Sequence, residues 1–591
     1  MLDPYRMVIV NLVASAVLLV GLIAYRYVYP RKKFNLFAVL LLISLLPIIS
    51  LLRKGAYESG DFNFNIYKSM SLLTALKDGQ LLPGWAGELN SGYGYPLFIF
   101  TYPLPYYTIL LFKSLGLSFI ASEKLALASA FIASGTAMFL FIRSILNKTA
   151  AFVASVFYLF SPYHLVDTHF RVAIGEVFSF VFLPLVFFGV TKLIQTNKFR
   201  WFALVAVSQS LLILSHQAIS LISFPMITSY TLLMLITNKK TQLRNIVYYC
   251  LAIAFGYLLS AFYFLPVLFE LKYTLQAIGS EISFSHISDF LFSPWRWGFL
   301  FQGPKGELSF VVGYTQLVIV TLAVILAFKK TFKKQNKTLI YFFLAWFFLL
   351  FFLMQSFSKP VWNFLPIFKN FQFSYRLLVA VSFTTSILSA FAVLKMKNKY
   401  LVFMLVFVTI LYTILNWGQR RVIPEINDSA LRKNLPLSTV NGEGLSPAAP
   451  KWVDKDKIWM DKIPEFHLET INGQAKIADT FRNSYKHEYA VQAKTDIYLK
   501  ENTLYFPGWI VTANGKEIPI EFQNNKYSGV ITFRLKKGEY YLSVVFGNTT
   551  IRTASQYLSL FTMLVLICSF FILYLRSKKI VRFSKKYLPP L

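Results

Sequence analysis

The sequence contains little cysteine and few acidic residues. Among its 591 residues are two cysteines, Cys250 and Cys568, which both lie inside apolar runs, so neither a disulfide framework nor a cysteine-based zinc site is available. Asp and Glu number 27 against 59 Lys and Arg, which gives a formal net charge of +32. No Walker loop, Rossmann glycine fingerprint or G-x-S-x-G elbow is present, and this disfavours a nucleotide-driven pump.

Apolar runs dominate the chain instead, with 56% hydrophobic and 18% aromatic residues. Runs of about 20 residues are long enough to cross a bilayer core of about 30 Å as helices. We therefore expect a polytopic α-helical membrane protein with about thirteen spans. We place them at roughly 8–29, 34–52, 121–142, 149–166, 177–194, 201–216, 217–236, 245–268, 310–328, 338–354, 373–394, 400–416 and 555–575.

Lys and Arg cluster in every second connection between these spans. They form no single basic face, so we expect no nucleic-acid partner. The positive-inside rule places the basic connections in the cytoplasm. The protein would then be a multi-pass protein of the cell (plasma or inner) membrane, with an extracytoplasmic N-terminus and a cytoplasmic C-terminus. Its first run lacks a basic leader and a small-residue cleavage site, so we expect an uncleaved span.

This topology requires that residues 95–112 do not cross the membrane. Pro96, Pro103 and Pro105 disfavour a straight lipid-exposed helix there. We expect a juxtamembrane or re-entrant segment within a first outer loop of about 53–120.

The apolar runs stop between residues 417 and 554, which predicts an extracytoplasmic soluble domain. Its second half alternates apolar and polar residues, as in YSGVITFRL and YYLSVVFG, which is typical of short antiparallel strands. We expect a small β-sandwich there, after a partly irregular first half. The chain would thus comprise a transmembrane domain (1–416), the soluble domain (417–554), and a last helix with a basic tail (555–591).

Ionisable residues gather at the expected outer ends of the helices, which suggests an outward-facing cavity. The alternative is that charges sit at helix ends because interfacial water solvates them there. The residues are Asp61, Glu88, His164, Asp167, His169, Arg171, Glu176, His216, Glu270, His286, Asp289 and Arg376.

Three of these residues have a specific chemical use. Asp61, in a loop rich in Gly and aromatic residues, could act as a general base on a hydroxyl or as a metal ligand. Arg171 and Arg376 could grip phosphate oxygens, or could pair with Glu176 or another acid structurally. The spacings in SPYHLVDTHFRVAIGEV match no standard zinc motif.

The sequence resembles the C-type (GT-C) glycosyltransferases. The closest likeness is to the YfhO-like family and to the neighbouring membrane family called 6-pyruvoyl-tetrahydropterin synthase related, a label that does not imply pterin chemistry. The likeness is carried by GDFNFNIYKSMSLLTALKDGQLLPGW, GYGYPLFIFTYPLPYY, SPYHLVDTHFRVAIGE, LSHQAIS and FQFSYRLL, and by LYFPGWIVTANGKEIPI with LKKGEYYLSVVF in the soluble domain.

The resemblance implies a GT-C-like fold and transfer of a sugar from a polyprenyl-phosphate-linked donor to a glycan, lipid or protein acceptor of the cell envelope. Asp61 would be the catalytic acid of the first loop, and Arg376 would contact the carrier phosphate. Glu176 and His216 would line the pocket, with Arg171 and His164 as further substrate-binding residues.

The sequence departs from the family pattern at one point. Many relatives have a His or a second acid soon after the first-loop Asp, whereas this chain has Asn63 and Asn65. No cofactor is certain, and dependence on a divalent metal (Mg or Mn) stays open.

Two other functions compete with transfer chemistry. A transporter or flippase of lipid-linked glycans would use the same cavity, although transporters usually carry charges near the membrane midplane. An adhesion protein would need only one span. In the soluble domain, Tyr505, Trp509 and Tyr541 could contact an acceptor glycan, while Trp509 is more typical of a core position.

Overall fold

The computed structural model describes residues 6–238, 243–278, 282–329, 332–364, 371–418, 421–435, 446–454 and 463–587. The helices are α1 (Arg6–Val28), α2 (Leu36–Ile48), α3 (Phe62–Lys77), α4 (Leu97–Phe100), α5 (Leu104–Ser114), α6 (Phe119–Ile145), α7 (Lys148–Leu159), α8 (Pro162–Val166), α9 (Ile174–Thr196), α10 (Phe199–Ser215), α11 (Gln217–Thr237), α12 (Leu243–Leu259), α13 (Ala261–Glu270), α14 (Ile287–Leu291), α15 (Tyr314–Phe328), α16 (Lys334–Leu353), α17 (Lys359–Phe364), α18 (Leu378–Val393), α19 (Lys399–Leu411), α20 (Asp428–Asn434) and α21 (Thr550–Tyr587). The strands are β1 (Ala56–Tyr57), β2 (Val422–Ile423), β3 (Leu468–Asn472), β4 (Ala475–Arg482), β5 (Lys486–Ala493), β6 (Ile497–Leu504), β7 (Trp509–Ala513), β8 (Lys516–Ile518), β9 (Val530–Leu535) and β10 (Gly538–Phe546).

Eight helices of the described segments are long and apolar enough to cross a membrane, and two bent helix pairs raise the number to ten. The bends, of 48° and 73°, separate Lys148–Leu159 from Pro162–Arg171 and Leu243–Leu259 from Ala261–Tyr273. The other three expected spans are shorter apolar helices, Leu36–Leu52, Phe199–Ser215 and Tyr314–Phe328. The expected polytopic helical membrane protein is confirmed, with eight to ten spans supported by length and composition, and the other three of the thirteen expected spans are these shorter apolar helices.

Polar caps set where several of the helices begin. The side chains of Asn35, Ser118 and Asn147 accept hydrogen bonds from backbone amides in the first turns of α2, α6 and α7. Each cap satisfies an amide that has no partner inside the helix. The apolar runs that follow then extend the helices into the bundle.

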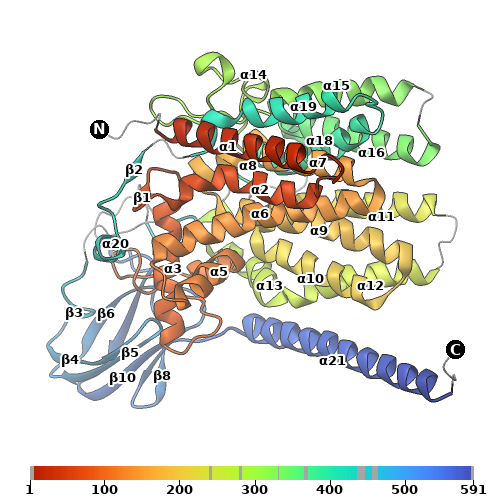
Figure 1. Cartoon of the computed structure of the whole chain (residues 1–591). Helices are drawn as coiled ribbons and strands as arrows, with labels where there is room; N and C mark the ends of the chain where they lie inside the picture. The colour runs from red at the N-terminus through yellow and green to blue at the C-terminus, as the bar shows by residue number, and fades with distance from the viewer. Residues whose placement is uncertain are drawn as a thin grey trace.

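Helix α18 lies at the centre of the bundle, with every residue from Leu378 to Val393 buried. It packs against α7, α15 and α16, while α9 packs against α6 and α10. Helices α1 and α21 instead carry exposed apolar side chains, such as Val17 and Phe571. Figure 1 shows α21 along one side of the bundle, well apart from α1. These outer helices present the apolar surface that a bilayer would cover.

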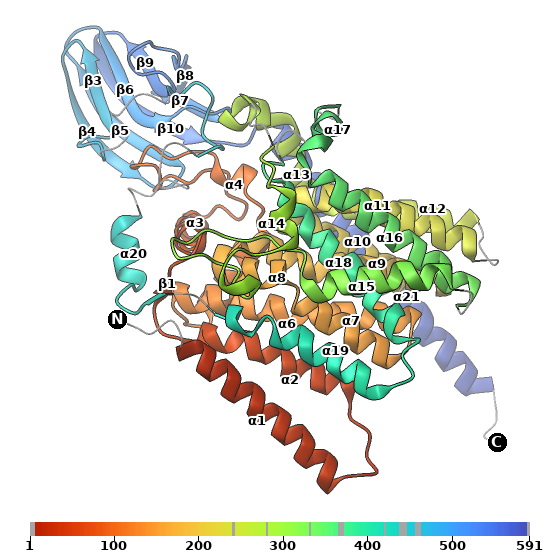
Figure 2. The same ribbon diagram turned by 90° about the horizontal axis from the view of Figure 1, so that it is seen from above.

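The soluble region contains two antiparallel sheets, of order β4-β5-β10-β7-β8 and β3-β6-β9. Buried residues alternate along β5, where His487, Tyr489 and Val491 face inward, and this period of two matches the expected pattern. The antiparallel β-domain before the last helix is therefore confirmed. The figures place it at one end of the bundle, next to α3 (Figures 1 and 2). Much of the first half, at 419–420, 436–445 and 455–462, lies outside the described residues.

The first outer loop contains three of the shorter helices, α3, α4 and α5. Residues 95–112, which we expected not to cross, form α4 and most of α5, and these two helices have four and eleven residues. Neither is long enough to span a bilayer. The loop is tied to the segment that follows α19 by the pairing of β1 with β2.

Candidate active site

Asp61 immediately precedes α3, and the backbone beside it is fixed to the segment that leads into α9. The amides of Gly60 and Asp61 donate to the carbonyls of Phe170 and Arg171, at 3.0 and 2.8 Å. A Cβ at Gly60 would lie 2.9 Å from the Arg171 carbonyl oxygen, so glycine permits this approach. The exposed Asp61 side chain does not cap α3, and the described residues offer its carboxylate no hydrogen bond or ion pair. The carboxylate is therefore left for another partner.

Arg171 is the last residue of a π-helical turn, Asp167–Arg171, which lies between α8 and α9. Its guanidinium donates to the Asp167 carboxylate at 2.6 Å, to the Tyr163 hydroxyl at 2.8 Å and to Glu176 Oε1 at 3.1 Å. The Tyr163 hydroxyl donates to Glu176 Oε2 at 2.6 Å. π-Helical turns occur often at functional sites, and this turn brings four polar groups together within one short segment.

Arg376 reaches the same glutamate from the turn that precedes α18. Its Nε lies 3.3 Å from Glu176 Oε1, and its two Nη atoms donate to the Phe371 carbonyl and the Gln372 side chain at 2.8 and 3.0 Å. The side chains of Arg171 and Arg376 are 12% and 14% exposed, whereas that of Glu176 is 1% exposed. Both arginines thus pair with Glu176, which is one of the two uses that the sequence left open.

Three cations act on Asp61 electrostatically. Although its side chain is exposed, protein atoms crowd around it, and this desolvation raises the pKa of Asp61 above its usual value. The positive charges of Lys68, Arg171 and Arg376 oppose that rise, in this order of strength. Asp61 is therefore a stronger base than an ordinary aspartate, with positive charge on more than one side.

A hydrogen-bond network extends from Lys68 below Asp61. Lys68 Nζ donates to the Tyr106 hydroxyl at 3.4 Å, and that hydroxyl donates to Asn65 Oδ1 at 3.1 Å. The Asn65 amide donates to Glu123 Oε1 at 2.9 Å. Burial lowers the pKa of Lys68, while the negative charge of Asp61 partly restores it. The network connects α3 to α5 and α6 and thereby holds the helix that carries Asp61.

Neither Lys68 nor Glu123 was named from the sequence. A local signal was available for Lys68, but none was available for Glu123. Lys68 follows Asp61 by seven residues, two helical turns, so a helix starting at residue 62 predicts that both residues share a face. Glu123 comes from α6, and no local pattern links it to α3. It supplies a buried carboxylate that accepts a hydrogen bond from the Asn65 amide.

His216 lies at the boundary between the expected spans 201–216 and 217–236, after α10 ends at Ser215 and before α11 begins. Its Nδ1 accepts from the Ile219 amide at 3.5 Å, and its ring centre is 5.1 Å from that of Tyr102. A Cβ at Gly175 would clash with the Tyr102 ring, so glycine allows α9, beside Glu176, to approach this aromatic pair.

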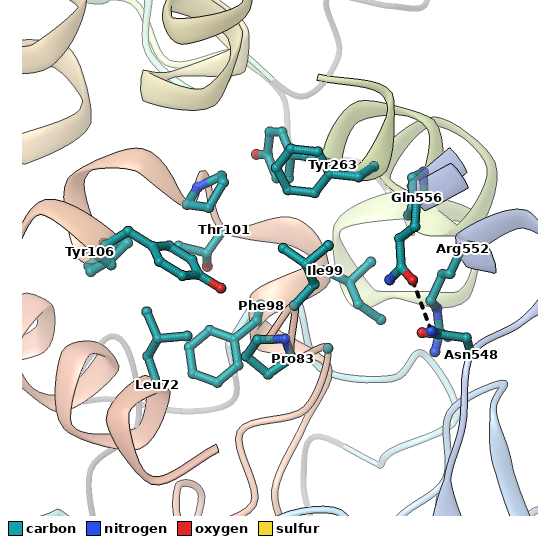
Figure 3. Close-up of a pocket in the computed structure, with 16 residues that line it drawn as sticks. Leu72, Pro83, Phe98, Ile99, Thr101, Tyr106, Tyr263, Asn548, Arg552 and Gln556 are labelled. Atoms are coloured by element: carbon teal, nitrogen blue, oxygen red, sulfur yellow. Dashed lines mark hydrogen bonds between the residues drawn. The ribbon is translucent and has the colours of Figure 1, made fainter. Parts of the chain in front are cut away.

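A largely apolar hollow of about 610 Å³, which includes space open to solvent, adjoins the hydrogen-bond network of Lys68 and Tyr106. It lies between the first outer loop, α13 and the start of α21 (Figure 3). Tyr106, which contacts Lys68 and Asn65, and Tyr263 both line it. Asn548, hydrogen-bonded to Gln556 at 3.2 Å, forms part of its polar edge in Figure 3. The hollow thus ends beside the network under Asp61.

Residues 99–422 match the model of the 6-pyruvoyl-tetrahydropterin synthase related domain, a family of membrane proteins. The match covers more than half of the chain. The chain belongs to this family. It is the second of the two families that the motifs resemble.

The relatives and structural neighbours of the chain are distant. A protein of uncharacterised function from Lactococcus lactis subsp. cremoris (strain MG1363) is 27% identical over 260 residues, which are 43% of this chain and 42% of the relative. Arabinofuranosyltransferase AftD from Mycobacteria aligns with 65% of this chain and 26% of its own, at 15% identity and a TM-score of 0.41. The oligosaccharyltransferase of Archaeoglobus fulgidus aligns over 65% and 56%, at 12% identity and a TM-score of 0.40. The chain spans less than two thirds of each of these proteins, and scores below 0.5 carry no inference about activity.

His164, next to Tyr163 in the chain, packs inside the helical core. Its side chain is fully buried and stacks on Phe180, with ring centres 4.0 Å apart. Its Nδ1 lies 3.2 Å from the Tyr158 carbonyl oxygen. The side chain of His164 is thus packed inside the helical core. Its surroundings do not support the predicted contact of His164 with substrate.

The side chains near Asp61 do not fit a divalent metal. In the parts of the chain that the structure describes, no group of three or more His, Cys, Asp or Glu side chains could hold a metal ion. Both oxygens of Glu176 accept hydrogen bonds from Arg171 and Tyr163. The cations that surround Asp61 would repel Mg²⁺ or Mn²⁺. Asp61 is better placed to act as a base than as a metal ligand.

Trp509 occupies the interface between the β-domain and the first outer loop. It is 4% exposed, and its ring meets that of Trp85 edge to face at 5.2 Å. Tyr505 stacks on Phe522 at 3.9 Å, whereas Tyr541 is 49% exposed. The expected core position of Trp509 is therefore observed, and Tyr541 is the most accessible of the three aromatic residues considered for glycan contact.

Proposed function

We propose that the protein is a membrane glycosyltransferase that transfers a sugar from a polyprenyl-phosphate-linked donor to an extracytoplasmic glycan, lipid or protein acceptor. The observation that carries the proposal is the Asp61 carboxylate, which has no partner among the described residues and experiences the charges of Lys68, Arg171 and Arg376. A base and positive charge are the two requirements for attack on a sugar phosphate.

The transfer balances without a co-reactant. Asp61 takes the proton of an acceptor hydroxyl while the oxygen of that hydroxyl forms a bond to the anomeric carbon of the donor sugar. The bond between that carbon and the phosphate oxygen breaks, and its electron pair stays on the phosphate. The nearby cations stabilise the polyprenyl phosphate that leaves. A single in-line displacement of this kind inverts the anomeric configuration.

The surroundings of the site suit a lipid-linked donor. We assign the apolar hollow beside Tyr106 to the prenyl chain, since the hollow lies among helices and ends near the network under Asp61. The positive-inside pattern supports an orientation with this end of the bundle outside the cytoplasm, where such a donor would bring its own activated bond.

Lipid analysis of a strain that lacks the gene tests the proposal. The strain should accumulate a polyprenyl-phosphate sugar, and the wild-type gene should remove it. Asp61→Asn should fail to remove it at equal protein level in the membrane. Glu58→Gln, a matched change at an exposed acid three residues away, should behave as wild type.

Two results would count against this function. Full complementation by Asp61→Asn would show that Asp61 is not the catalytic base. Movement of a lipid-linked glycan across protein-containing liposomes, with no sugar transferred, would favour the transporter instead.

A further inference from the structure

The loop between α14 and α15 displays one large aromatic side chain to the outside. Trp297 is 91% exposed, more than any other large hydrophobic side chain among the described residues. Tryptophan is normally buried for much of its surface, because its ring loses favourable burial energy in water. An exposed tryptophan therefore calls for a partner.

The backbone holds Trp297 in this position at a conformational cost. Arg296, Trp297 and Gly298 have successive positive φ angles of 43°, 57° and 88°. A residue with a side chain rarely adopts such angles, and each instance costs of the order of 1 kcal/mol. A strained turn persists only where its surroundings determine it.

The surroundings of this turn do determine it. The Tyr314 hydroxyl donates to the Gly298 carbonyl at 2.8 Å, and the Asn416 side chain donates to the Phe299 carbonyl at 2.8 Å. Ser293 Oγ donates to the Leu300 carbonyl. The exposure of Trp297 is thus part of an ordered structure that is fixed to the first residue of α15.

The position of the loop indicates what covers Trp297. Figure 1 shows α14 at the top of the bundle, beside the near end of α15, whereas the β-strands project beyond the bundle at the lower left. Exposed apolar side chains continue from the loop, at Phe292 and Phe299, to Val318 on the outer surface of α15. A surface that leads from this loop onto an apolar helix, with a tryptophan and an exposed Arg296 at its margin, matches the boundary between lipid tails and headgroups.

We propose that the turn Trp295–Leu300 is an interfacial anchor, in which Trp297 inserts among the headgroups of the outer leaflet. The anchor is connected to the candidate active site. Phe310, in the same loop, stacks on Tyr375 at 3.8 Å, and the Arg171 guanidinium lies 5.1 Å from the Tyr375 ring. The anchor would set the depth of the Arg171 and Glu176 cluster relative to the lipid surface. The proposal stands independently of glycosyl transfer.

Spin-label accessibility tests the anchor. In a chain carrying Cys250→Ser and Cys568→Ser, single cysteines are introduced as Trp297→Cys, Val318→Cys and Lys516→Cys, labelled, and reconstituted in phosphatidylethanolamine and phosphatidylglycerol vesicles. Val318 on α15 and exposed Lys516 on β8 are the lipid and water references. A label at 297 should be several-fold less accessible to a water-soluble nickel complex than the label at 516, while oxygen still reaches it.

Two outcomes would overturn the proposal. Equal nickel accessibility at 297 and 516 would place Trp297 in water. Protection from both nickel and oxygen would mean that protein, such as a second copy of this chain, covers it. If the cysteine variant does not fold, Trp297→Phe provides the second measurement. Vesicles with brominated acyl chains should then quench a smaller part of the fluorescence than in wild type, and an unchanged quenched part would contradict the anchor.

Discussion

Glu176 Oε1 lies 3.1 Å from a guanidinium nitrogen of Arg171 and 3.3 Å from Nε of Arg376, so one buried carboxylate oxygen joins two arginines that are 205 positions apart in the chain. This junction connects the π-helical turn to the start of α18. It also holds two positive charges close to Asp61. The structural pairing and the proposed chemistry therefore depend on the same residue.

Replacing Glu176 by Gln should destabilise the protein. The change leaves two largely buried guanidinium groups without their shared negative charge, and breaking such a buried pair costs about 3 kcal/mol. The apparent Tm of the purified protein in detergent should fall by several degrees. Glu488→Gln, at a surface pair with Lys486 in the β-domain, is the control and should leave Tm nearly unchanged. An unaltered Tm in Glu176→Gln would show that the junction does not stabilise the bundle.

Removing the charge of Lys68 should shift the pH dependence of transfer. The positive charge of Lys68 lowers the pKa of Asp61, so Lys68→Met should raise it. Because Asp61 must be deprotonated to act as a base, activity falls as pH drops through this pKa, and the acid limb should move to higher pH. Transfer rates in membrane vesicles across a pH series measure the shift. Lys68→Arg keeps the charge and should retain the wild-type limb; an identical limb in Lys68→Met would separate Lys68 from Asp61.

Local patterns in the sequence predicted the elements better than the contacts between them. Apolar runs, caps and prolines act over a few neighbouring residues, so the helices, the turn at His216 and the strands were predictable. The distribution of Lys and Arg among the connections predicted that Asp61, Arg171 and Arg376 lie at the same end of the bundle. The pairing of both arginines with Glu176 depends on a π-helical turn and on the packing of α18, which no local pattern specifies.

The same distinction explains why the surroundings of His164 and the role of Glu123 could not be read from the sequence. His164 and Glu176 occupy the same short segment, yet His164 turns into the core and stacks on Phe180. Glu123 reaches Asn65 from another helix. Such positions follow from how helices pack in three dimensions and not from the type of residue or its spacing.

The interface of the β-domain with the first outer loop should depend on Trp509. Its ring packs against Trp85 and Phe546 at centre distances of 5.2 and 5.3 Å. Trp509→Ala would leave a cavity and should cost about 3 to 5 kcal/mol, with faster proteolysis between the domain and the bundle. Tyr541→Ala, at an exposed position, should leave proteolysis unchanged. If Trp509 contacted glycan instead, its removal would weaken acceptor binding without altering proteolysis.

The β-domain should also lose stability in acid through Glu501. Burial alone would raise the pKa of this carboxylate, but His487, Arg482 and hydrogen bonds to it hold the pKa well below its ordinary value of 4.5. His487 Nδ1 and the Tyr489 hydroxyl both lie 2.9 Å from Glu501 Oε1. A carboxylate whose pKa is depressed by folding contributes stability that is fully present above the unfolded pKa and is lost as pH falls toward the folded one. Thermal unfolding at pH values from 7 down to about 3 should therefore show Tm falling below about pH 4.5. Glu501→Gln should lower Tm at neutral pH and flatten this dependence, because the proton that wild type must bind in acid is no longer taken up there. A variant with the wild-type slope would assign the acid sensitivity to another group.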